Sequence, residues 1–170
     1  MEHLTKQQVL DLLKVARAHS ERDYVMILVG YAHGLRASEI CGLTAQQIRD
    51  GYITVQRLKG SLRTTQPLIH GAGLLDERAA LKGWMTDRPK GRLFDIQRAQ
   101  FFNVFRAHCE EAGIPAHLRH PHILKHSVAM HQIKRAGIEN LKVYLGHKSI
   151  ASTGSYLKVN DAEASAAMKF

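Results

Sequence analysis

The sequence lacks the features that mark secreted and membrane-spanning proteins. It contains only two cysteines, Cys41 and Cys109, and no spacing motif links them, which favours reduced core thiols in a cytosol over a disulfide. No apolar run approaches the ~20 residues that a membrane-spanning helix needs. The first residues, MEHLTKQQ, lack the apolar stretch of a secretory signal. These absences predict a cytoplasmic protein without a membrane partner.

The common zinc motifs are also missing, because the chain has neither a CxxC nor an HExxH sequence. Eleven histidines nevertheless keep a metal site as an alternative. The candidate ligands are His117, His120, His122 and His126, with Cys109 nearby in the sequence. His122 and His126 are one helical turn apart, a spacing that can bind zinc. Since no acidic residue stands beside them in a metalloprotease arrangement, we favour an interpretation with no metal and no cofactor.

Positive charge is in clear excess. Lysine and arginine number 24 against 15 acidic residues, which gives a formal net charge of +9. This excess favours a polyanionic partner, first nucleic acid and second an anionic membrane, over a merely basic soluble protein. A chain of 170 residues suits one domain, or a core domain with a tail.

Helical patterns dominate the chain. Thr5 and Gln8 form a capping box at the start of the first predicted helix, and a second helical stripe ends near Gly34. The stripe that contains Phe101 and Phe105 predicts a helix packed into the core rather than an aromatic platform for bases. Further helices are predicted over 138–146, 149–158 and 160–170.

One β-hairpin is predicted between the helical segments. An alternating run over 52–58 follows Asp50-Gly51, Lys59-Gly60-Ser61 forms a turn, and 62–68 is the return strand, with Pro67 on an exposed edge. The predicted fold class is therefore mainly α with a small antiparallel β-hairpin or sheet (α+β). Three basic residues cluster at the predicted tip of the hairpin: Arg57, Lys59 and Arg63. Such a tip serves either solubility or a directed function.

The stretch from His120 to Tyr156 concentrates the reactive side chains. His122, Lys125 and His126 share one face of a predicted helix, since they lie at positions i, i+3 and i+4. Pro121 suits the first turn of that helix, and the apolar residues that follow lie around much of its circumference. A buried helix with such groups at its start indicates an anion-binding centre.

These residues resemble the catalytic core of tyrosine recombinases, the phage integrase family. The sequence HILKH over 122–126 is similar to the family pattern His-x-x-Arg-His; Leu-Gly-His follows at 145–147, and Tyr156 comes nine residues after the histidine. The segment GLRASEI over 34–40 resembles the family's first arginine motif, and Lys59 stands where the family places its catalytic lysine. The motifs occur in order over residues 4–156, and their wording is especially similar to short fimbrial phase-variation recombinases.

The resemblance implies the catalytic-domain fold of tyrosine recombinases and a site-specific recombinase or integrase that cleaves and rejoins double-stranded DNA. Tyr156 is the expected nucleophile of a 3′-phosphotyrosine intermediate, Arg36 the bidentate phosphate ligand, and Lys59 the proton donor to the leaving 5′-oxygen. The expected catalytic residues are Arg36, Lys59, His122, Lys125, His147 and Tyr156. The expected DNA contacts are Arg57, Arg63, His126 and Lys148. Tyr144 is the competing tyrosine and is assigned to packing.

One position departs from the family pattern, because Lys125 stands where the family has its second arginine. Lysine is a point charge on a flexible stem, whereas arginine offers two parallel donors. By analogy with oxyanion-hole deletions, losing a bidentate donor costs about 10²–10³ in rate, and the retained positive charge of lysine is expected to soften that loss. This leaves open a weakened recombinase, a DNA-binding regulator that hardly cuts, and a type IB topoisomerase-like enzyme that relaxes DNA with the same residues.

The resemblance also implies a domain organisation. Residues 1–158 are expected to form the catalytic domain, and 159–170 a tail that protomers exchange. The chain is expected to lack the helical N-terminal core-binding domain of the family, either as a minimal recombinase or as an excised fragment. The expected assembly is a homotetramer on DNA, formed from a protein that is a monomer in free solution.

Overall fold

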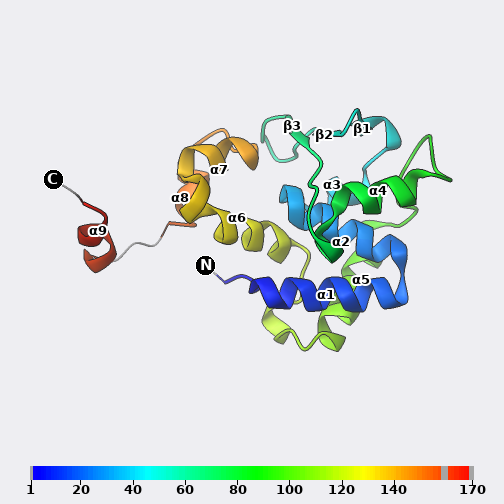
Figure 1. Cartoon of the computed structure of the whole chain (residues 1–170), viewed down its shortest axis with the longest axis horizontal. Helices are drawn as coiled ribbons and strands as arrows, with labels where there is room; N and C mark the ends of the chain where they lie inside the picture. Colours follow the sequence, from blue (N-terminus) through cyan, green and yellow to red (C-terminus); the bar gives the residue numbers. More distant parts are fainter. Residues whose placement is uncertain (1, 158–160, 169–170) are drawn as a thin grey trace.

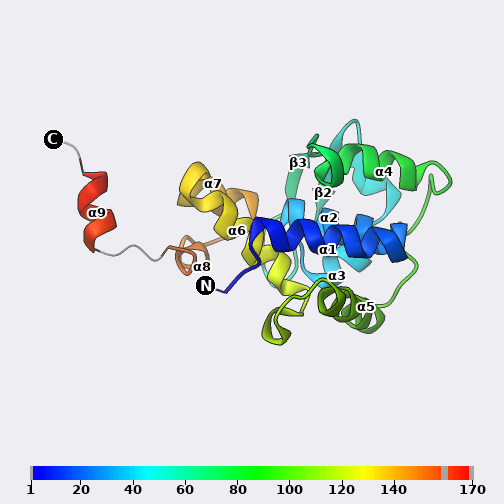
Figure 2. The ribbon, with the colours of Figure 1, turned by 60° about the horizontal axis from the view of Figure 1, so that its bottom comes forward.

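The computed structural model describes residues 2–157 and 161–168. The interior is organised around one helix, α2 (Glu21–His33), whose sequence YVMILVG is apolar on every side, as a helix buried all round requires. The helices that contact α2 are α1 (Lys6–His19), α3 (Ala37–Cys41), α4 (Glu77–Met85), α5 (Arg98–Glu111) and α6 (His122–Ala136). Figure 1 and Figure 2 show α2 enclosed between these helices and the small sheet.

The predicted starts and ends of the first two helices are confirmed. Thr5 and Gln8 form the capping box of α1. Gly34 ends α2 in the left-handed conformation with φ 61°, where an added Cβ would lie 2.7 Å from a methyl group of Leu145. This close approach brings the end of α2 against the segment that carries the Leu-Gly-His motif.

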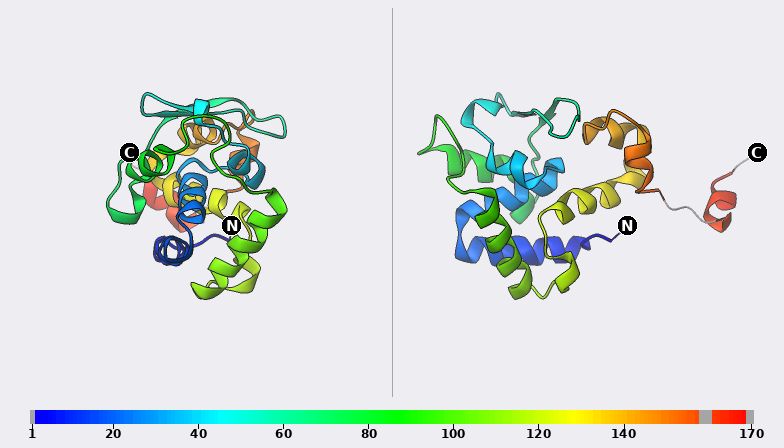
Figure 3. Two further views of the ribbon diagram at one scale, coloured as in Figure 1. Left: turned by 90° about the vertical axis from the view of Figure 1, so that its right-hand side faces the viewer. Right: turned by 180° about the vertical axis from the view of Figure 1, so that it is seen from behind.

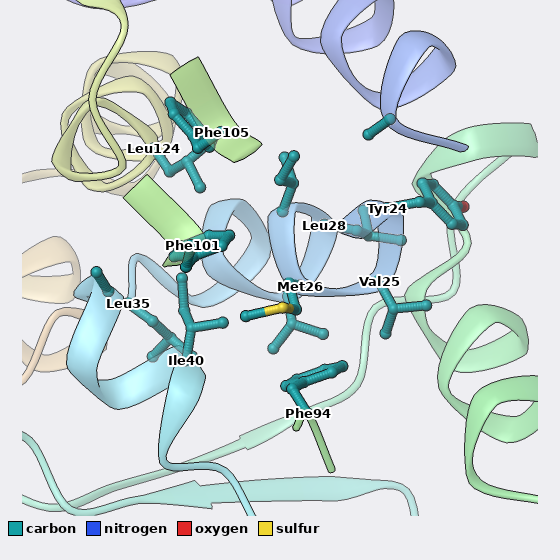
Figure 4. Packing of buried hydrophobic residues seen from close by; sticks show 14 of the residues in the cluster. Tyr24, Val25, Met26, Leu28, Leu35, Ile40, Phe94, Phe101, Phe105 and Leu124 are labelled. Atoms are coloured by element: carbon teal, nitrogen blue, oxygen red, sulfur yellow. The ribbon is translucent and has the colours of Figure 1, made fainter. Parts of the chain in front are cut away.

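The aromatic stripe of α5 belongs to the core, as predicted. Phe101 and Phe105 are fully buried, and Figure 4 shows them close to Met26 of α2 and Leu124 of α6. These rings are therefore closed to bases. Cys41 and Cys109 are both buried and free, which confirms reduced core thiols; burial raises the pKa of both, that of Cys109 to about 12.

The sheet has three antiparallel strands in the order β1 (Ile48–Arg49), β2 (Tyr52–Val55) and β3 (Thr64–Pro67). The predicted hairpin of β2 and β3 is confirmed, with Val55 opposite Thr64, but both strands are shorter than expected. The ladder ends after Val55, and further along the backbone N–H of Leu58 donates to the carboxylate of Glu39 outside the sheet. The sequence interpretation missed β1, which Asp50 and Gly51 join to β2 through a two-residue turn with φ values of 53° and 80°.

Three short helices follow α6: α7 (Ile138–Tyr144), α8 (Ala151–Gly154) and α9 (Asp161–Ala167). The predicted helix over 149–158 is wrong in its extent. It ends at Gly154, and Tyr156 lies in the turn that follows, where its N–H donates to the carbonyl of Thr153. Residues 158–160 and 169–170 of the predicted C-terminal segments lie outside the described residues. Figure 3 shows α9 projecting away from the body of the molecule.

The remaining regular segments are the 3₁₀ turns η1 (Ala45–Gln47), η2 (Gly73–Leu75) and η3 (Ala116–Leu118). Over residues 2–157 and 161–168, no helix is both long enough and apolar enough to span a bilayer.

Candidate active site

Arg36 lies at the N-cap of α3, directly after the end of α2, and Glu39 holds it there. The backbone N–H of Arg36 donates to Glu39 at 2.8 Å, and its guanidinium Nη1 lies 3.5 Å from the same carboxylate. Nη1 also donates to the carbonyl of Leu58 at 3.1 Å, while the N–H of Leu58 donates to Glu39 at 2.9 Å. One buried carboxylate thus joins the first arginine motif to the hairpin.

The role of Glu39 was not recognised from the sequence. The available signal was its position three residues after the N-cap, where a glutamate folds back to bond the N-cap N–H. The side chain of Arg36 keeps 20% of its surface exposed, so the guanidinium is open to an incoming anion.

Lys125 is only 2% exposed and lies close enough to Arg36 for their charges to interact. Among the described residues, its Nζ has no hydrogen-bond partner. Burial, followed by the charges of Arg36 and Arg57, lowers the pKa of this lysine to about 8 against the opposing effect of Glu39. A buried ammonium group without acceptors is unfavourable on its own. The arrangement is therefore that of a group completed by an anion.

Two histidines share this positive environment. Burial, followed by the charges of Lys125, Arg36 and Arg57, lowers the pKa of His147 to about 4, and Nδ1 of this ring lies 2.9 Å from the hydroxyl of Thr153. Packing around His122 also lowers the pKa of its partly open ring to about 4, with contributions from His126, Lys125 and Arg36. Both rings are neutral at pH 7 in the free protein.

Tyr156 reaches the same centre from the turn after α8. Its phenol oxygen lies 3.2 Å from Nδ1 of His126, whose ring stands edge-on to that of His122 with centroids 4.4 Å apart. The tyrosine is 5% exposed and packs against the apolar cluster formed by α6 and α7. Burial raises the pKa of this phenol, and the charge of Arg36 opposes the rise. Tyr156, Arg36 and the histidines therefore lie within electrostatic reach of one another.

His126, expected to contact DNA, thus lies against the phenol of the proposed nucleophile. Tyr144 packs in the interior, as expected, where its hydroxyl donates to the carbonyl of Ala32 at 2.6 Å and burial raises its pKa to about 12.

The hairpin residues do not all lie where the sequence placed them. Lys59 and Arg63 are exposed, and Lys59 occupies the tip of the turn with φ 54°. The expectation that Arg57 belongs to an exposed basic tip is wrong, because this residue is only 2% exposed and its guanidinium points inward to backbone carbonyls. Lys148, the fourth expected DNA contact, is exposed beside His147.

The geometry offers little to the zinc alternative. In the part of the chain that the structure describes, no group of three or more histidine, cysteine, aspartate or glutamate side chains is placed to hold a metal ion. His117 instead approaches Glu2 at 3.5 Å.

Solved structures with this fold are catalytic parts of DNA recombinases. One is the XerH site-specific recombinase bound to its difH substrate before cleavage (TM-score 0.78, 18% identity), which aligns with 97% of this chain and 53% of that one. Another is a lambda integrase tetramer bound to a Holliday junction (TM-score 0.72, 17% identity), with 92% and 48% coverage. These likenesses define the fold as that of tyrosine recombinase catalytic domains, and the chain spans about half the length of both structures.

Sequence comparison gives the family. Residues 2–163 match the phage integrase family. The type 1 fimbriae regulatory protein FimB of Escherichia coli strain K12 is 32% identical over 177 residues, which cover 92% of this chain and 84% of FimB. The chain belongs to the phage integrase family, and the predicted similarity to fimbrial recombinases is confirmed.

Proposed function

We propose that this protein is a site-specific DNA recombinase that cleaves and rejoins strands through a 3′-phosphotyrosine intermediate. Its family membership supports a tyrosine recombinase. The observation that carries the proposal is the buried ammonium of Lys125, which has no hydrogen-bond partner in the described part of the chain and interacts electrostatically with Arg36, His122 and His147. A phosphodiester supplies the anion that this cluster needs.

The proposed cleavage is a transesterification that needs no co-reactant. The phenol oxygen of Tyr156 forms a bond to phosphorus as the bond from phosphorus to the 5′-oxygen breaks. The phenol loses its proton, which His126 is placed to accept at 3.2 Å, and the leaving oxygen gains a proton from Lys59. Arg36 and Lys125 stabilise the charge that develops on the nonbridging oxygens. The reverse reaction rejoins the strand.

His122 and His147 complete the proposed phosphate site as hydrogen-bond donors. A neutral imidazole donates through one nitrogen only. When the Thr153 hydroxyl donates to Nδ1 of His147, the proton of that ring lies on Nε2 and is available to a phosphate oxygen. In that arrangement the contact with Thr153 is compatible with the tautomer that the proposed reaction uses.

Binding is proposed to involve double-stranded DNA, with Arg63 and Lys148 as exposed phosphate contacts.

We assign the reaction to residues 1–158 and the exchange between protomers to 159–170, within a tetramer of the kind that the lambda integrase structure contains. An apolar groove of about 630 Å³ between α1, α2, α6 and α7 is the proposed seat for the exchanged α9. A DNA substrate favours a cytoplasmic location. Removal of 159–170 should leave single-site cleavage and abolish tetramers on DNA in analytical ultracentrifugation.

The test of the chemistry is covalent trapping on a nicked DNA substrate, from which the short fragment that carries the freed 5′-hydroxyl escapes. The expected result is a protein–DNA adduct that maps to Tyr156 by peptide mass and disappears in Tyr156→Phe. Tyr144→Phe is the matched control and should still form the adduct. Binding without any adduct would identify the DNA-binding regulator instead. Relaxation of supercoiled DNA without paired sites would identify a topoisomerase-like enzyme.

A further inference from the structure

We propose that Arg57 is a positioning residue that sets the place of the Lys59 turn relative to Arg36 and His147. The inference rests on the proposed recombinase function, since it concerns the groups that carry out cleavage. It replaces the expectation, drawn from the sequence, that Arg57 binds DNA directly.

The guanidinium of Arg57 bonds to three separate segments. Nη1 and Nη2 donate to the last carbonyls of α2, Gly34 at 3.1 Å and His33 at 2.9 Å, just before Arg36. Nη2 also donates to the carbonyl of Tyr144 at 3.2 Å, at the end of α7 and three residues before His147. Nε donates to the hydroxyl of Thr64 on β3 at 2.9 Å. One side chain thus ties together the segments that lead to the arginine, the lysine turn and the histidine.

Charge reinforces these bonds. The side chains of Arg57 and Glu39 are both fully buried, with Nη1 and Oε1 4.0 Å apart. The same carboxylate accepts the N–H groups of Arg36 and Leu58, so the ion pair reaches both neighbouring segments. A buried guanidinium is stable only when its donors are satisfied, and here the acceptors are backbone carbonyls whose positions the side chain therefore helps to define.

The acceptors on Arg57's inner side are themselves held. Nε2 of Gln66 donates to the carbonyl of Tyr144, while its Oε1 lies 2.7 Å from Nδ1 of the His33 ring. Nε2 of that ring lies 2.8 Å from the buried carboxylate of Glu77. These bonds hold the segments that carry the His33 and Tyr144 carbonyls in place. Arg57 therefore binds to fixed acceptors, and the exposed turn of the hairpin is the segment that it positions.

The Lys59 turn is tied at both ends next to Arg57. On one side, Leu58 donates to Glu39; on the other, the N–H of Leu62 donates to the carbonyl of Gly146 at 2.8 Å. Gly146 has φ 71°, and a Cβ there would lie 2.9 Å from Cγ of Arg57 and 2.7 Å from the carbonyl oxygen of Leu62. The turn, the Leu-Gly-His segment and the Arg57 stem are in such close contact that a shift of one displaces the others.

The test compares Arg57→Lys with the exposed control Arg63→Met. DNA affinity, its salt dependence and single-turnover cleavage are measured on normal DNA and on DNA with sulfur in place of the leaving 5′-oxygen. A sulfur leaving group needs no proton, so it bypasses Lys59. Arg57→Lys should keep the wild-type affinity and salt slope, lose about 10²-fold in cleavage of normal DNA, and recover most of that loss on the sulfur substrate. Arg63→Met should show the opposite pattern, with weaker binding, a salt slope smaller by about one and no selective recovery on the sulfur substrate.

A second variant covers the case in which Arg57→Lys does not fold. Thr64→Val removes only the acceptor of Nε and should give a smaller cleavage loss with the same recovery on sulfur. Loss of salt slope in Arg57→Lys, or equal cleavage losses on both substrates, would overturn the inference. If the wild type forms no adduct, the proposed function fails; if the wild type cleaves and both variants cleave normally, only the positioning role fails.

Discussion

Nδ1 of His126 lies 3.2 Å from the phenol oxygen of Tyr156, so a proton acceptor adjoins the proposed nucleophile before DNA arrives. The pKa of His126 is lowered by burial and then by the charges of His120 and Lys125, which keeps the ring neutral at pH 7. A neutral ring can take the phenol proton, whereas a protonated ring cannot.

The first prediction follows from this contact. The wild-type cleavage rate should fall as the pH drops below the usual histidine range near 6.5, because protonation removes the base. His126→Ala should cleave about 10²-fold more slowly and should lose this acid limb. Single-turnover rates from pH 5 to 8 measure both effects. An unchanged acid limb in the variant would assign the proton to another acceptor.

The second prediction concerns Lys125→Arg. The wild-type ammonium loses its proton as the pH rises through about 8, and a bound phosphate shifts that loss upward. Wild-type cleavage should therefore decline in alkaline solution, whereas the arginine variant should stay flat because its guanidinium remains charged. At neutral pH the arginine should restore part of the bidentate contact and raise the rate by about tenfold or more. An equal rate and an identical pH profile would show that this position is not limiting.

The third prediction is that the buried charge of Lys125 lowers the stability of the fold while it supports cleavage. The folded pKa of Lys125 is about 8 against 10.5 for the free side chain, so between these values the unfolded chain binds more protons than the folded one. The free energy of unfolding should therefore rise with pH across this window, and at pH 7 the buried charge costs about 3 kcal/mol.

Lys125→Met should accordingly be more stable at pH 7 by about 2–3 kcal/mol, lack the alkaline rise, and lose cleavage. Urea unfolding at pH 7 and pH 10 measures the stability. Lys148→Met, at an exposed lysine, is the control and should unfold like the wild type. A Lys125→Met protein less stable than the wild type would mean that the ammonium already has a partner.

Local signals accounted for much of the fold. The capping box at Thr5 and the end of α2 at Gly34 each depend on a few neighbouring residues, so the sequence shows them directly. The inward direction of the Arg57 side chain could not be predicted in this way. The alternating pattern extends the strand to Arg57, whereas β2 ends at Val55. The guanidinium turns inward because it bonds to carbonyls at the ends of α2 and α7, which are distant in the sequence. The helix expected around Tyr156 ends at Gly154, and the contacts that Tyr156 makes with α6 and α7 are also distant in the sequence.

In the candidate site, too, the sequence predicted some residues and missed others. The motifs identified Arg36, His122, Lys125, His147 and Tyr156, and the structure brings these side chains into one positive cluster. Their supporting partners, Glu39 and Thr153, escaped notice because a single glutamate or threonine is common on any helix. Lys59 remains a prediction, since the contacts of its turn lie in the backbone and its side chain is exposed.

The fourth prediction is proton uptake on DNA binding. The pKa values of His122 and His147 are lowered to about 4 in the free protein by burial and by neighbouring positive charge. A bound phosphate introduces negative charge and raises both values, so the complex binds more protons than its separated parts. DNA affinity should increase as the pH falls from 7 to 5, and His122→Asn with His147→Asn should flatten that increase. Titration calorimetry in two buffers of different ionisation enthalpy measures the protons directly.

The last prediction uses salt to separate exposed cations from buried ones. Phosphate contacts release counterions, so the logarithm of the binding constant should fall steeply with the logarithm of salt concentration, by about 0.9 for each contact. Arg63→Met and Lys148→Met should each reduce the slope by about one, because both side chains are exposed. Tyr156→Phe should leave the slope unchanged, since it removes no charge. A flat salt profile for the wild type would count against DNA as the substrate and, with it, against every assignment of the positive cluster to phosphate.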